Sequence, residues 1–173
     1  MTDQTADQTA DQTGAPAAAP AIQAGTPAPD FTMPTDGGGS VTLSALKGTP
    51  VILYFYPKDD TSGCTSEACG FRDQFPNFRG ADAVVIGVSK DSVASHDKFK
   101  AKYELPFILA SDKETKVAEA YGVWVEKSMY GRKYMGLERA TFLIDRDGVV
   151  RNVWRKVKVT GHVDAVLKAL KAL

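Results

Sequence analysis

Short apolar runs alternate with segments of helical spacing along residues 25–173. Unbroken apolar runs at 51–56, 84–88 and 142–144 are rich in β-branched and aromatic residues, which is typical of strands covered on both faces. Residues 107–109 and the more alternating segment 149–157 predict two further strands. The sequence DRDG at 145–148 lies between two of these runs and predicts a hairpin turn.

Helices are predicted between these strands. The first follows a cap at residue 91 or 92 and stops before Pro106. The second runs from Asp112 to Gly122. The third follows Gly161 and has apolar residues at 163, 166, 167 and 170. Alternating β and α units with one late hairpin predict an α/β fold with a mixed central β-sheet flanked by helices. The order of the strands is left open.

The first 24 residues have a different composition. They repeat a Thr-Asp-Gln or Ala-Asp-Gln unit and then continue as an Ala/Pro stretch without aromatic residues. Such a segment cannot bury enough apolar surface to offset the entropy of ordering, so residues 1–24 are predicted to be a disordered low-complexity tail. The segment lacks the basic start and apolar core of a secretory signal. We therefore expect one domain, residues 25–173, in the cytoplasm.

Composition excludes several classes of function. Lys plus Arg and Asp plus Glu both number 21, so no excess of positive charge is available for nucleic acid. No apolar run approaches the roughly 20 residues that a membrane span requires. Two cysteines are too few for a disulfide scaffold, and a structural zinc site needs further ligands. These two thiols are the candidate chemistry.

Cys64 falls at the start of a predicted helix, directly after the strongest strand. Apolar residues at 68, 71 and 75 share its spacing, which predicts one helix face running to about Pro76. With Thr61 or Ser62 as N-cap, Cys64 lies in the first turn. There the helix dipole and free backbone N–H groups favour the thiolate. The acidic pair at 59–60 opposes this effect, so a nearby cation is required.

Cys69 lies five residues after Cys64, which on an ideal helix is about 140° of rotation and about 7.5 Å of rise. The two Cα atoms are then roughly 8.7 Å apart, beyond the roughly 7 Å that a disulfide spans. Either the pair never bonds, or the helix unwinds when it does. The spacing predicts that oxidation of the pair is coupled to local unfolding.

Other interpretations of the cysteines stay open at this point. A lone buried cysteine is most often a small apolar side chain. The two histidines, His96 and His162, fall at or near predicted helix starts, where surface or capping positions are expected. A metal site or an oriented His base is therefore not expected. The Cys-x-x-Cys motif of thiol–disulfide oxidoreductases is absent.

The segment at 54–73, YFYPKDDTSGCTSEACGFRD, resembles the catalytic segment of the peroxiredoxins. Its Cys-x4-Cys spacing is similar to that of the bacterioferritin comigratory protein/peroxiredoxin Q subfamily. The resemblance continues through GTPAPDF at 25–31, VIGVS at 85–89, MYGRKYMGLERATFLIDRDG at 129–148, and Gly161-His162. It covers the chain apart from the tail.

The resemblance implies a thioredoxin-like fold and a peroxidase without haem, flavin, metal or other cofactor. It implies that Cys64 is the peroxidatic cysteine, which forms a sulfenic acid, and that Cys69 is the resolving cysteine, which condenses with it to a disulfide. The implied substrates are hydrogen peroxide and organic hydroperoxides. Thioredoxin or a similar dithiol protein would restore the thiols. The subfamily also suggests a monomer.

Three further side chains match family residues. Thr61 matches a hydroxyl that binds peroxide and thiolate, Arg139 an arginine that brings positive charge to the sulfur, and Pro57 a proline that shields the pocket. Backbone N–H groups of Gly63 and Cys64 would donate to the peroxide oxygens. Taken alone, Thr61 is better explained as a helix cap, Arg139 as a surface cation paired with Glu138, and Pro57 as a strand terminator. Their common register with Cys64 favours the functional interpretation instead.

Two positions depart from the family pattern: Ala140 replaces the usual Ser or Thr, and Ser62 replaces a frequent Pro. Residues 130, 134 and 135 (Tyr, Tyr, Met) could line the active-site rim or a partner surface, or pack as a loop. Two rival functions are a redox sensor or holdase using the same disulfide, and a protein thiol–disulfide oxidoreductase. Turnover with a dithiol donor and an insulin reduction assay distinguish them.

Overall fold

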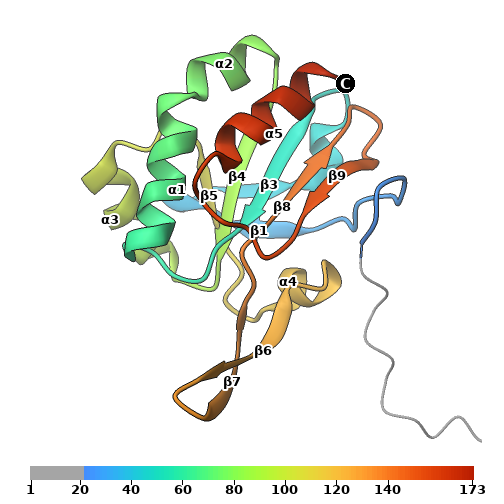
Figure 1. Cartoon of the computed structure of the whole chain (residues 1–173). Coiled ribbons are helices and arrows are strands. Elements are labelled where there is room, and N and C mark those ends of the chain that lie inside the picture. Colours follow the sequence, from blue (N-terminus) through green and yellow to red (C-terminus); the bar gives the residue numbers. More distant parts are fainter. Residues whose placement is uncertain (1–21) are drawn as a thin grey trace, which may run out of the picture.

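The computed structural model describes residues 22–173, which form a mixed five-stranded sheet flanked by helices (Figure 1). The strand order is β5-β4-β3-β8-β9. Strands β3, β4 and β5 are parallel, whereas β8 is antiparallel to β3 and β9 is antiparallel to β8. The five strands are β3 (Val51–Phe55), β4 (Val84–Ser89), β5 (Ile108–Ser111), β8 (Ala140–Ile144) and β9 (Val150–Trp154). The predicted fold class is confirmed.

The helices lie where connections between strands require them. Helices α1 and α2 join β3 to β4, α3 joins β4 to β5, α4 follows β5, and α5 ends the chain. Their bounds are α1 (Ser62–Asp73), α2 (Phe75–Gly80), α3 (Val93–Tyr103), α4 (Lys116–Ala120) and α5 (His162–Lys171). Short 3-10 turns occur at Asp36–Gly38 and Leu43–Leu46. Crossover helices of this kind allow neighbouring strands to run parallel.

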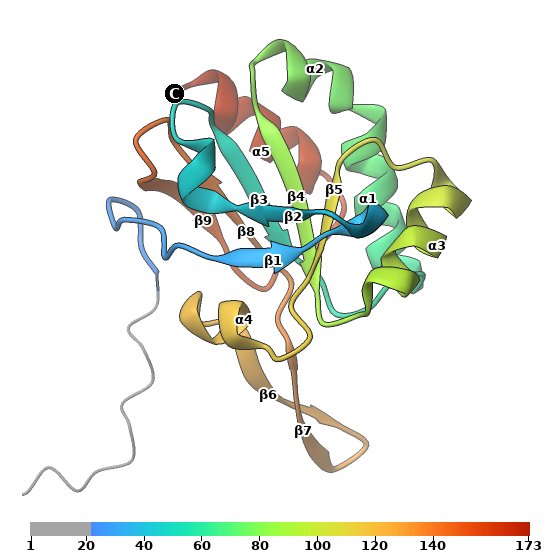
Figure 2. The same ribbon diagram turned by 180° about the vertical axis from the view of Figure 1, so that it is seen from behind.

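Alternation along β3 builds a core on each face of the sheet. Leu53 and Phe55 face one core, which includes β1 (Thr32–Pro34), β2 (Ser40–Thr42) and the region of α4. Ile52 and Tyr54 face the other core, which is covered by α1, α2, α3 and α5. Figure 2 shows the β1–β2 hairpin and α4 on the side opposite α5. Burial of both faces explains why the apolar runs are unbroken.

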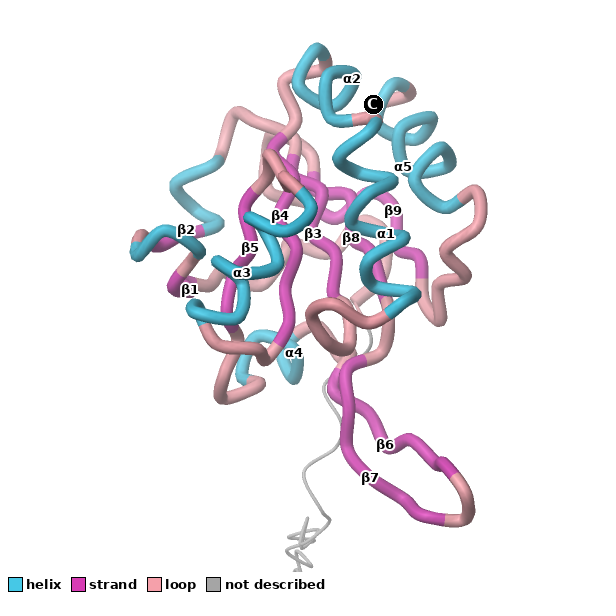
Figure 3. Tube along the Cα trace, turned by 90° about the vertical axis from the view of Figure 1, so that its left-hand side faces the viewer, coloured by secondary structure: helices cyan, strands magenta, loops and turns pink. Residues whose placement is uncertain are grey.

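A second hairpin extends away from the sheet. Strands β6 (Trp124–Met129) and β7 (Arg132–Leu137) pair only with each other and project from the body of the protein (Figure 3). Tyr130, Tyr134 and Met135 lie on this hairpin with exposed side chains. The alternative that these residues pack as a loop is therefore wrong.

The predicted elements are largely present, with two differences in extent. The helix expected from Asp112 to Gly122 is limited to α4, and Asp112 instead accepts the backbone N–H groups of Val117 and Ala118 at 3.2 and 2.8 Å. The side chain of Ile22 is 8% exposed and belongs to a core, so ordered packing begins before residue 25. The rest of the predicted tail, residues 1–21, lies outside the described residues. No helix among residues 22–173 is long and apolar enough to cross a membrane.

Candidate functional site

Cys64 is the third residue of α1, at the end of the loop that leaves β3. The helix begins at Ser62 with Thr61 as the N-cap residue, and the side chain of Cys64 is 1% exposed. A thiol at this position lies in the first turn, beside backbone N–H groups that have no partner within the helix. Cys64 is therefore buried, but at the end of the helix that best accommodates negative charge.

Arg139 supplies the cation that the sequence requires. The residue directly precedes β8, and its Nη2 atom donates to Cys64 Sγ at 3.3 Å. The side chain is only 16% exposed, so water screens this contact less than it screens a surface pair. The structure thus joins two residues that are 75 positions apart in the chain. A guanidinium at this distance stabilises negative charge on the sulfur.

The absence of a side chain at Gly63 makes room for this contact. A Cβ atom at Gly63 would lie 3.1 Å from Nη2 of Arg139, closer than ordinary van der Waals contact. A residue with a side chain at this position would require the guanidinium to shift by a few tenths of an ångström.

Glu67 is a buried carboxylate of the site that the sequence analysis missed. Arg139 Nη1 donates to Glu67 Oε1 at 2.8 Å, and Glu67 Oε2 has no hydrogen-bond partner among the described residues. Burial raises the pKa of Glu67 to about 7, although Arg139 acts in the opposite direction. One guanidinium therefore bridges the Cys64 sulfur and a carboxyl group that titrates near neutrality. The signal in the sequence was an acidic residue three positions after Cys64, on the same helix face.

Lys127 brings a second positive charge toward the site from β6 of the projecting hairpin. Burial and the nearby charge of Arg139 lower the pKa of Lys127, while Cys64 acts in the opposite direction. Its aliphatic stem lies beside Gly136 on the paired strand. The hairpin thus contributes to the electrostatics of the thiol as well as extending into solvent.

Thr61 and Pro57 lie in the loop between β3 and α1. Thr61 Oγ1 donates to the Lys58 carbonyl at 3.0 Å and makes no side-chain hydrogen bond to the helix start. Pro57 is partly buried and follows the end of β3. The structure therefore places both residues near the start of α1, with the Thr61 hydroxyl turned to its own loop.

Cys69 lies in the second half of α1 and is partly buried, and both cysteines are free. Because α1 is continuous from Ser62 to Asp73, ideal helix geometry keeps the two Cα atoms roughly 8.7 Å apart. A disulfide cannot form at this separation. The helix ends at Asp73, and Phe75 and Pro76 belong to α2, so the single helix predicted to run to about Pro76 is divided into two.

Both histidines are buried, so the expected surface or capping positions were wrong. His96 is fully buried between Asp59 and the carbonyl of Ala110, at 2.7 and 3.0 Å. It lies three residues before Phe99 on the inward face of α3, a spacing that would have indicated burial. His162 is 6% exposed, and its Nε2 atom lies 2.7 Å from Thr141 Oγ1. Burial and Arg139 lower the pKa of His162 to about 4.

No cluster of three or more His, Cys, Asp or Glu side chains suited to a metal ion occurs within residues 22–173. The site brings together the thiol of Cys64, the guanidinium of Arg139 and the carboxyl group of Glu67. A mixed sheet with flanking helices, and an arginine-paired thiol at a helix start, define the class of thioredoxin-like proteins that act through a cysteine.

Comparison with known proteins defines the family within this class. Residues 24–153 match the AhpC/TSA family. The chain is 53% identical to peroxiredoxin Bcp of Bacillus subtilis over 150 residues, which span 87% of this chain and 96% of that protein. It is 42% identical to peroxiredoxin Bcp of Escherichia coli over 150 residues, which span 87% of this chain and 96% of that protein. The chain belongs to the AhpC/TSA family and is a peroxiredoxin of the Bcp/peroxiredoxin Q type.

Solved structures agree with this assignment. The Xanthomonas campestris bacterioferritin comigratory protein, described with its alkyl peroxide reduction activity, is 48% identical with a TM-score of 0.79 over 82% of this chain and 90% of that chain. A Cys-to-Ser variant of Xylella fastidiosa peroxiredoxin Q has a TM-score of 0.83 and 39% identity over 87% and 96%. The family resemblance and the thiol peroxidase activity expected from the sequence are confirmed.

Proposed function

We propose that Cys64 is the peroxidatic cysteine of this peroxidase and that Arg139 activates it. The observation that carries the proposal is the contact of Arg139 Nη2 with Cys64 Sγ in the first turn of α1. In the reaction, the Cys64 thiolate attacks the terminal oxygen of the hydroperoxide and the O–O bond breaks. The sulfur becomes a sulfenic acid, and the departing alkoxide or hydroxide takes up a proton to leave as alcohol or water.

The same cation supports the reaction at the departing oxygen. Negative charge moves from sulfur to oxygen as the O–O bond breaks, and a guanidinium beside the sulfur stabilises both ends of this movement. Backbone N–H groups of Gly63 and Cys64 face the same first turn and are proposed to hold the peroxide oxygens. Thr61 is proposed to donate to the peroxide after its hydroxyl turns from Lys58, and Pro57 to limit entry of water.

Cys69 is proposed as the resolving cysteine. Its sulfur attacks the Cys64 sulfenic acid, a disulfide forms and water leaves. Because α1 holds the two residues too far apart to bond, the helix opens before this step. The cysteines replaced by serine in the Xanthomonas campestris structures are much farther apart in the sequence than Cys64 and Cys69. The pairing is therefore a proposal for this chain in its own right.

Peroxiredoxin activity requires a hydroperoxide substrate and a dithiol reductant. We propose thioredoxin or a similar dithiol protein as that reductant, since disulfide exchange with a dithiol restores both thiols without a cofactor. We propose hydrogen peroxide and small organic hydroperoxides as substrates. The protein is proposed to act as a cytoplasmic monomer, which size-exclusion chromatography with light scattering tests.

Steady-state peroxide consumption with thioredoxin, thioredoxin reductase and NADPH tests the assignment of the two cysteines. Cys64→Ser is expected to abolish turnover, and Cys69→Ser to allow one oxidation of Cys64 but no thioredoxin-dependent cycling. Serine is a close isostere of cysteine, so both variants keep the helix. Full turnover by Cys64→Ser would contradict the proposal, and undiminished cycling by Cys69→Ser would remove Cys69 from it.

A further inference from the structure

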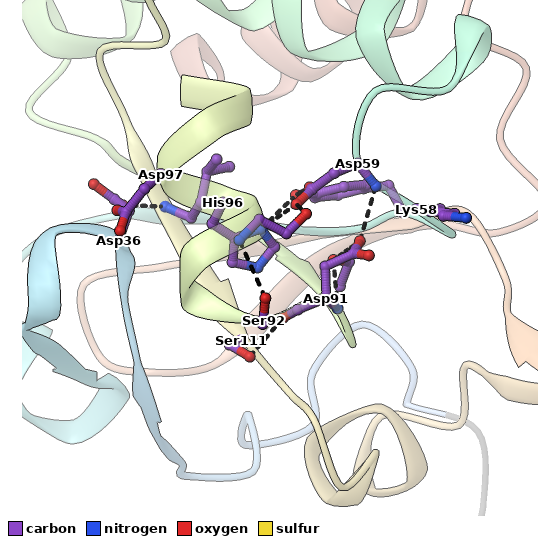
Figure 4. Close-up of polar contacts among 12 residues, drawn as sticks. Asp36, Lys58, Asp59, Asp91, Ser92, His96, Asp97 and Ser111 are labelled. Atoms are coloured by element: carbon purple, nitrogen blue, oxygen red, sulfur yellow. Dashed lines mark hydrogen bonds and ion pairs between the residues drawn. The ribbon is translucent and has the colours of Figure 1, made fainter. Parts of the chain in front are cut away.

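A buried polar cluster lies between α3 and the loop that carries Thr61. Its centre is Asp59, which is 7% exposed. The Asp59 carboxylate accepts from Tyr56 Oη at 2.5 Å and from Ser95 Oγ at 2.8 Å, and its Oδ2 atom lies 2.7 Å from His96 Nδ1. Figure 4 shows Asp59 and His96 facing each other between the loop and α3. The proposed reaction uses none of these groups directly.

His96 connects this carboxylate to the sheet. Its Nε2 atom lies 3.0 Å from the Ala110 carbonyl on β5. A carbonyl only accepts, so Nε2 carries a hydrogen, and Nδ1 and Asp59 share one further hydrogen between them. Both ring nitrogens are thereby satisfied inside the protein, and the ring cannot rotate without losing two buried hydrogen bonds.

Asp91 fixes the backbone of the same loop. The N–H group of Asp59 donates to Asp91 Oδ2 at 2.8 Å, and Ser89 Oγ donates to the same oxygen at 2.7 Å. Ser111 Oγ donates to the Asp91 carbonyl at 2.6 Å (Figure 4). Ser89 and Ser111 end β4 and β5. Through Asp91, the loop after β3 is therefore bound to the carboxyl ends of the parallel strands β4 and β5.

The loop requires this support because its conformation is unfavourable. Asp60 has a φ of 57°, the left-handed region that a residue with a Cβ atom adopts at a cost. Its carboxylate receives Lys102 Nζ and Tyr103 Oη, both at 2.7 Å. Two successive aspartates thus attach the loop to α3, the first from a buried position and the second from the surface.

The attachments stop before the segment that has to open. Within residues 57–73, the side-chain hydrogen bonds to α3 come from Asp59 and Asp60, upstream of α1, and from Arg72, which donates to the Tyr103 carbonyl. The partners of the Asp59 and Asp60 side chains therefore all lie outside α1. The conformation of the loop determines where Thr61 and the first turn of α1 lie relative to the peroxide.

We propose that Asp59 and His96 are positioning residues for peroxide reduction, which hold residues 57–61 in the conformation that places Thr61 and the start of α1 around Cys64. The inference rests on the proposed role of Cys64. Neither residue touches the reacting atoms. Misplacement of a reacting arrangement by about 1 Å lowers rates by about 100-fold, so the pair is expected to control the oxidation step and not the later disulfide step.

The test is rapid-mixing measurement of the two steps in single turnover with hydrogen peroxide. Asp59→Asn is expected to lower the second-order rate constant of Cys64 oxidation by about 10- to 100-fold. The rate constant of disulfide formation with Cys69 is expected to change less than about two-fold. His96→Asn, whose amide can still donate toward Asp59, is expected to retain more of the oxidation rate than His96→Leu.

Asp112→Asn is the matched control. Asp112 is 5% exposed and is also a hydrogen-bonded carboxylate, but it accepts the backbone N–H groups of Val117 and Ala118 in α4. Its substitution is expected to lower the melting temperature and leave the oxidation rate unchanged. If Asp59→Asn does not fold, Ser95→Ala, which removes one donor to Asp59, is expected to give a smaller fall in the same rate constant.

A folded Asp59→Asn variant with the wild-type oxidation rate would overturn the inference. If Asp59→Asn does not fold, an unchanged oxidation rate in Ser95→Ala would overturn it. Equal rates for His96→Asn and His96→Leu would show that the histidine serves stability only. Cys64→Ser is measured in the same experiment. Oxidation that persists in Cys64→Ser would contradict the proposed function itself, so the two failures are distinguishable.

Discussion

At the scale of single residues, the site depends on how Arg139 divides its hydrogen bonds. Nη2 faces the Cys64 sulfur and Nη1 faces the Glu67 carboxylate. The sequence could indicate Cys64 and its need for a cation, because the helix start and the acidic pair at 59–60 are local features. It could not indicate that Glu67 shares this cation, because the contact depends on how β8 lies against α1.

Arg139 is expected to control how fast Cys64 is oxidised. Arg139→Met is expected to lower the rate constant of Cys64 oxidation by about 100- to 1,000-fold, the effect of removing one preorganised electrostatic group. Stopped-flow mixing with hydrogen peroxide measures the rate. Arg155→Met is the control, because Arg155 also pairs with a buried glutamate, Glu138, at 3.0 Å but makes no contact with Cys64. Equal losses in both variants would mean that Arg139 acts through stability alone.

Glu67 makes stability depend on pH. Its pKa rises from 4.5 to about 7 on folding, so the folded state keeps this proton over a pH range in which the unfolded state has lost it. The free energy of unfolding therefore falls as pH rises from about 4.5 to about 7, by roughly 3 kcal/mol from this group. Above about pH 7 the contribution is constant.

Glu67→Gln is expected to remove this component. Melting temperatures of the two proteins between pH 5 and pH 8, measured by circular dichroism, are expected to diverge, with the variant gaining relative stability as pH rises. Other titrating groups, including His162, cancel in the comparison. If the melting temperatures of the two proteins changed equally with pH across this range, the pKa of Glu67 would not be raised.

At the scale of elements, the sequence pattern predicted the strands and helices whose buried positions follow a regular spacing. The runs that form β3, β4 and β8 are buried on both faces, and α5 has a single apolar stripe facing the core. The β6–β7 hairpin was missed because its strands project from the sheet and most of their side chains are exposed, so no alternation marks a core face. The three-residue strands β1 and β2 are too short for a periodic signal.

Opening of α1 is expected to limit disulfide formation. Ser66 is exposed in the interior of this helix. There glycine is less favourable than alanine by about 1 kcal/mol, which is about a five-fold change in the open population. Ser66→Gly is expected to form the Cys64–Cys69 disulfide about five times faster than Ser66→Ala after oxidation, as measured by acid quench and mass spectrometry.

The same change elsewhere serves as the control for helix opening. Ala101→Gly weakens α3 at an exposed interior position and is expected to leave the disulfide rate unchanged. Identical disulfide rates for the two Ser66 variants would show that opening of α1 does not control this step.

At the scale of the whole molecule, the fold brings together residues that no local pattern relates. The α/β class followed from alternating β and α units, but the strand order did not, because periodicity carries no information on which strands pair. That order places β8 beside β3 and so brings Arg139 to Cys64. It also encloses His96, whose partners come from the loop after β3 and from β5, elements that are adjacent only after folding.

Oxidation is expected to lower the stability of the whole domain. Opening α1 exposes Ala68 and Phe71, which are both buried in the core against the sheet, while a short disulfide loop restricts the unfolded chain little. The oxidised protein is expected to melt at a lower temperature than the reduced protein in scanning calorimetry. Cys69→Ser, which cannot form the disulfide, is expected to show no comparable loss after the same treatment. A higher melting temperature on oxidation would contradict coupled opening.

Cys64 is proposed to react with peroxide and then to bond with Cys69. The most direct test of this proposal is the intact mass of the reduced protein after one equivalent of hydrogen peroxide, followed by peptide mapping. The predicted result is the loss of two hydrogens, located to a Cys64–Cys69 disulfide. A stable oxygen adduct on Cys64 with Cys69 still reduced would contradict the resolving role of Cys69. No rapid change at either cysteine would contradict the whole account.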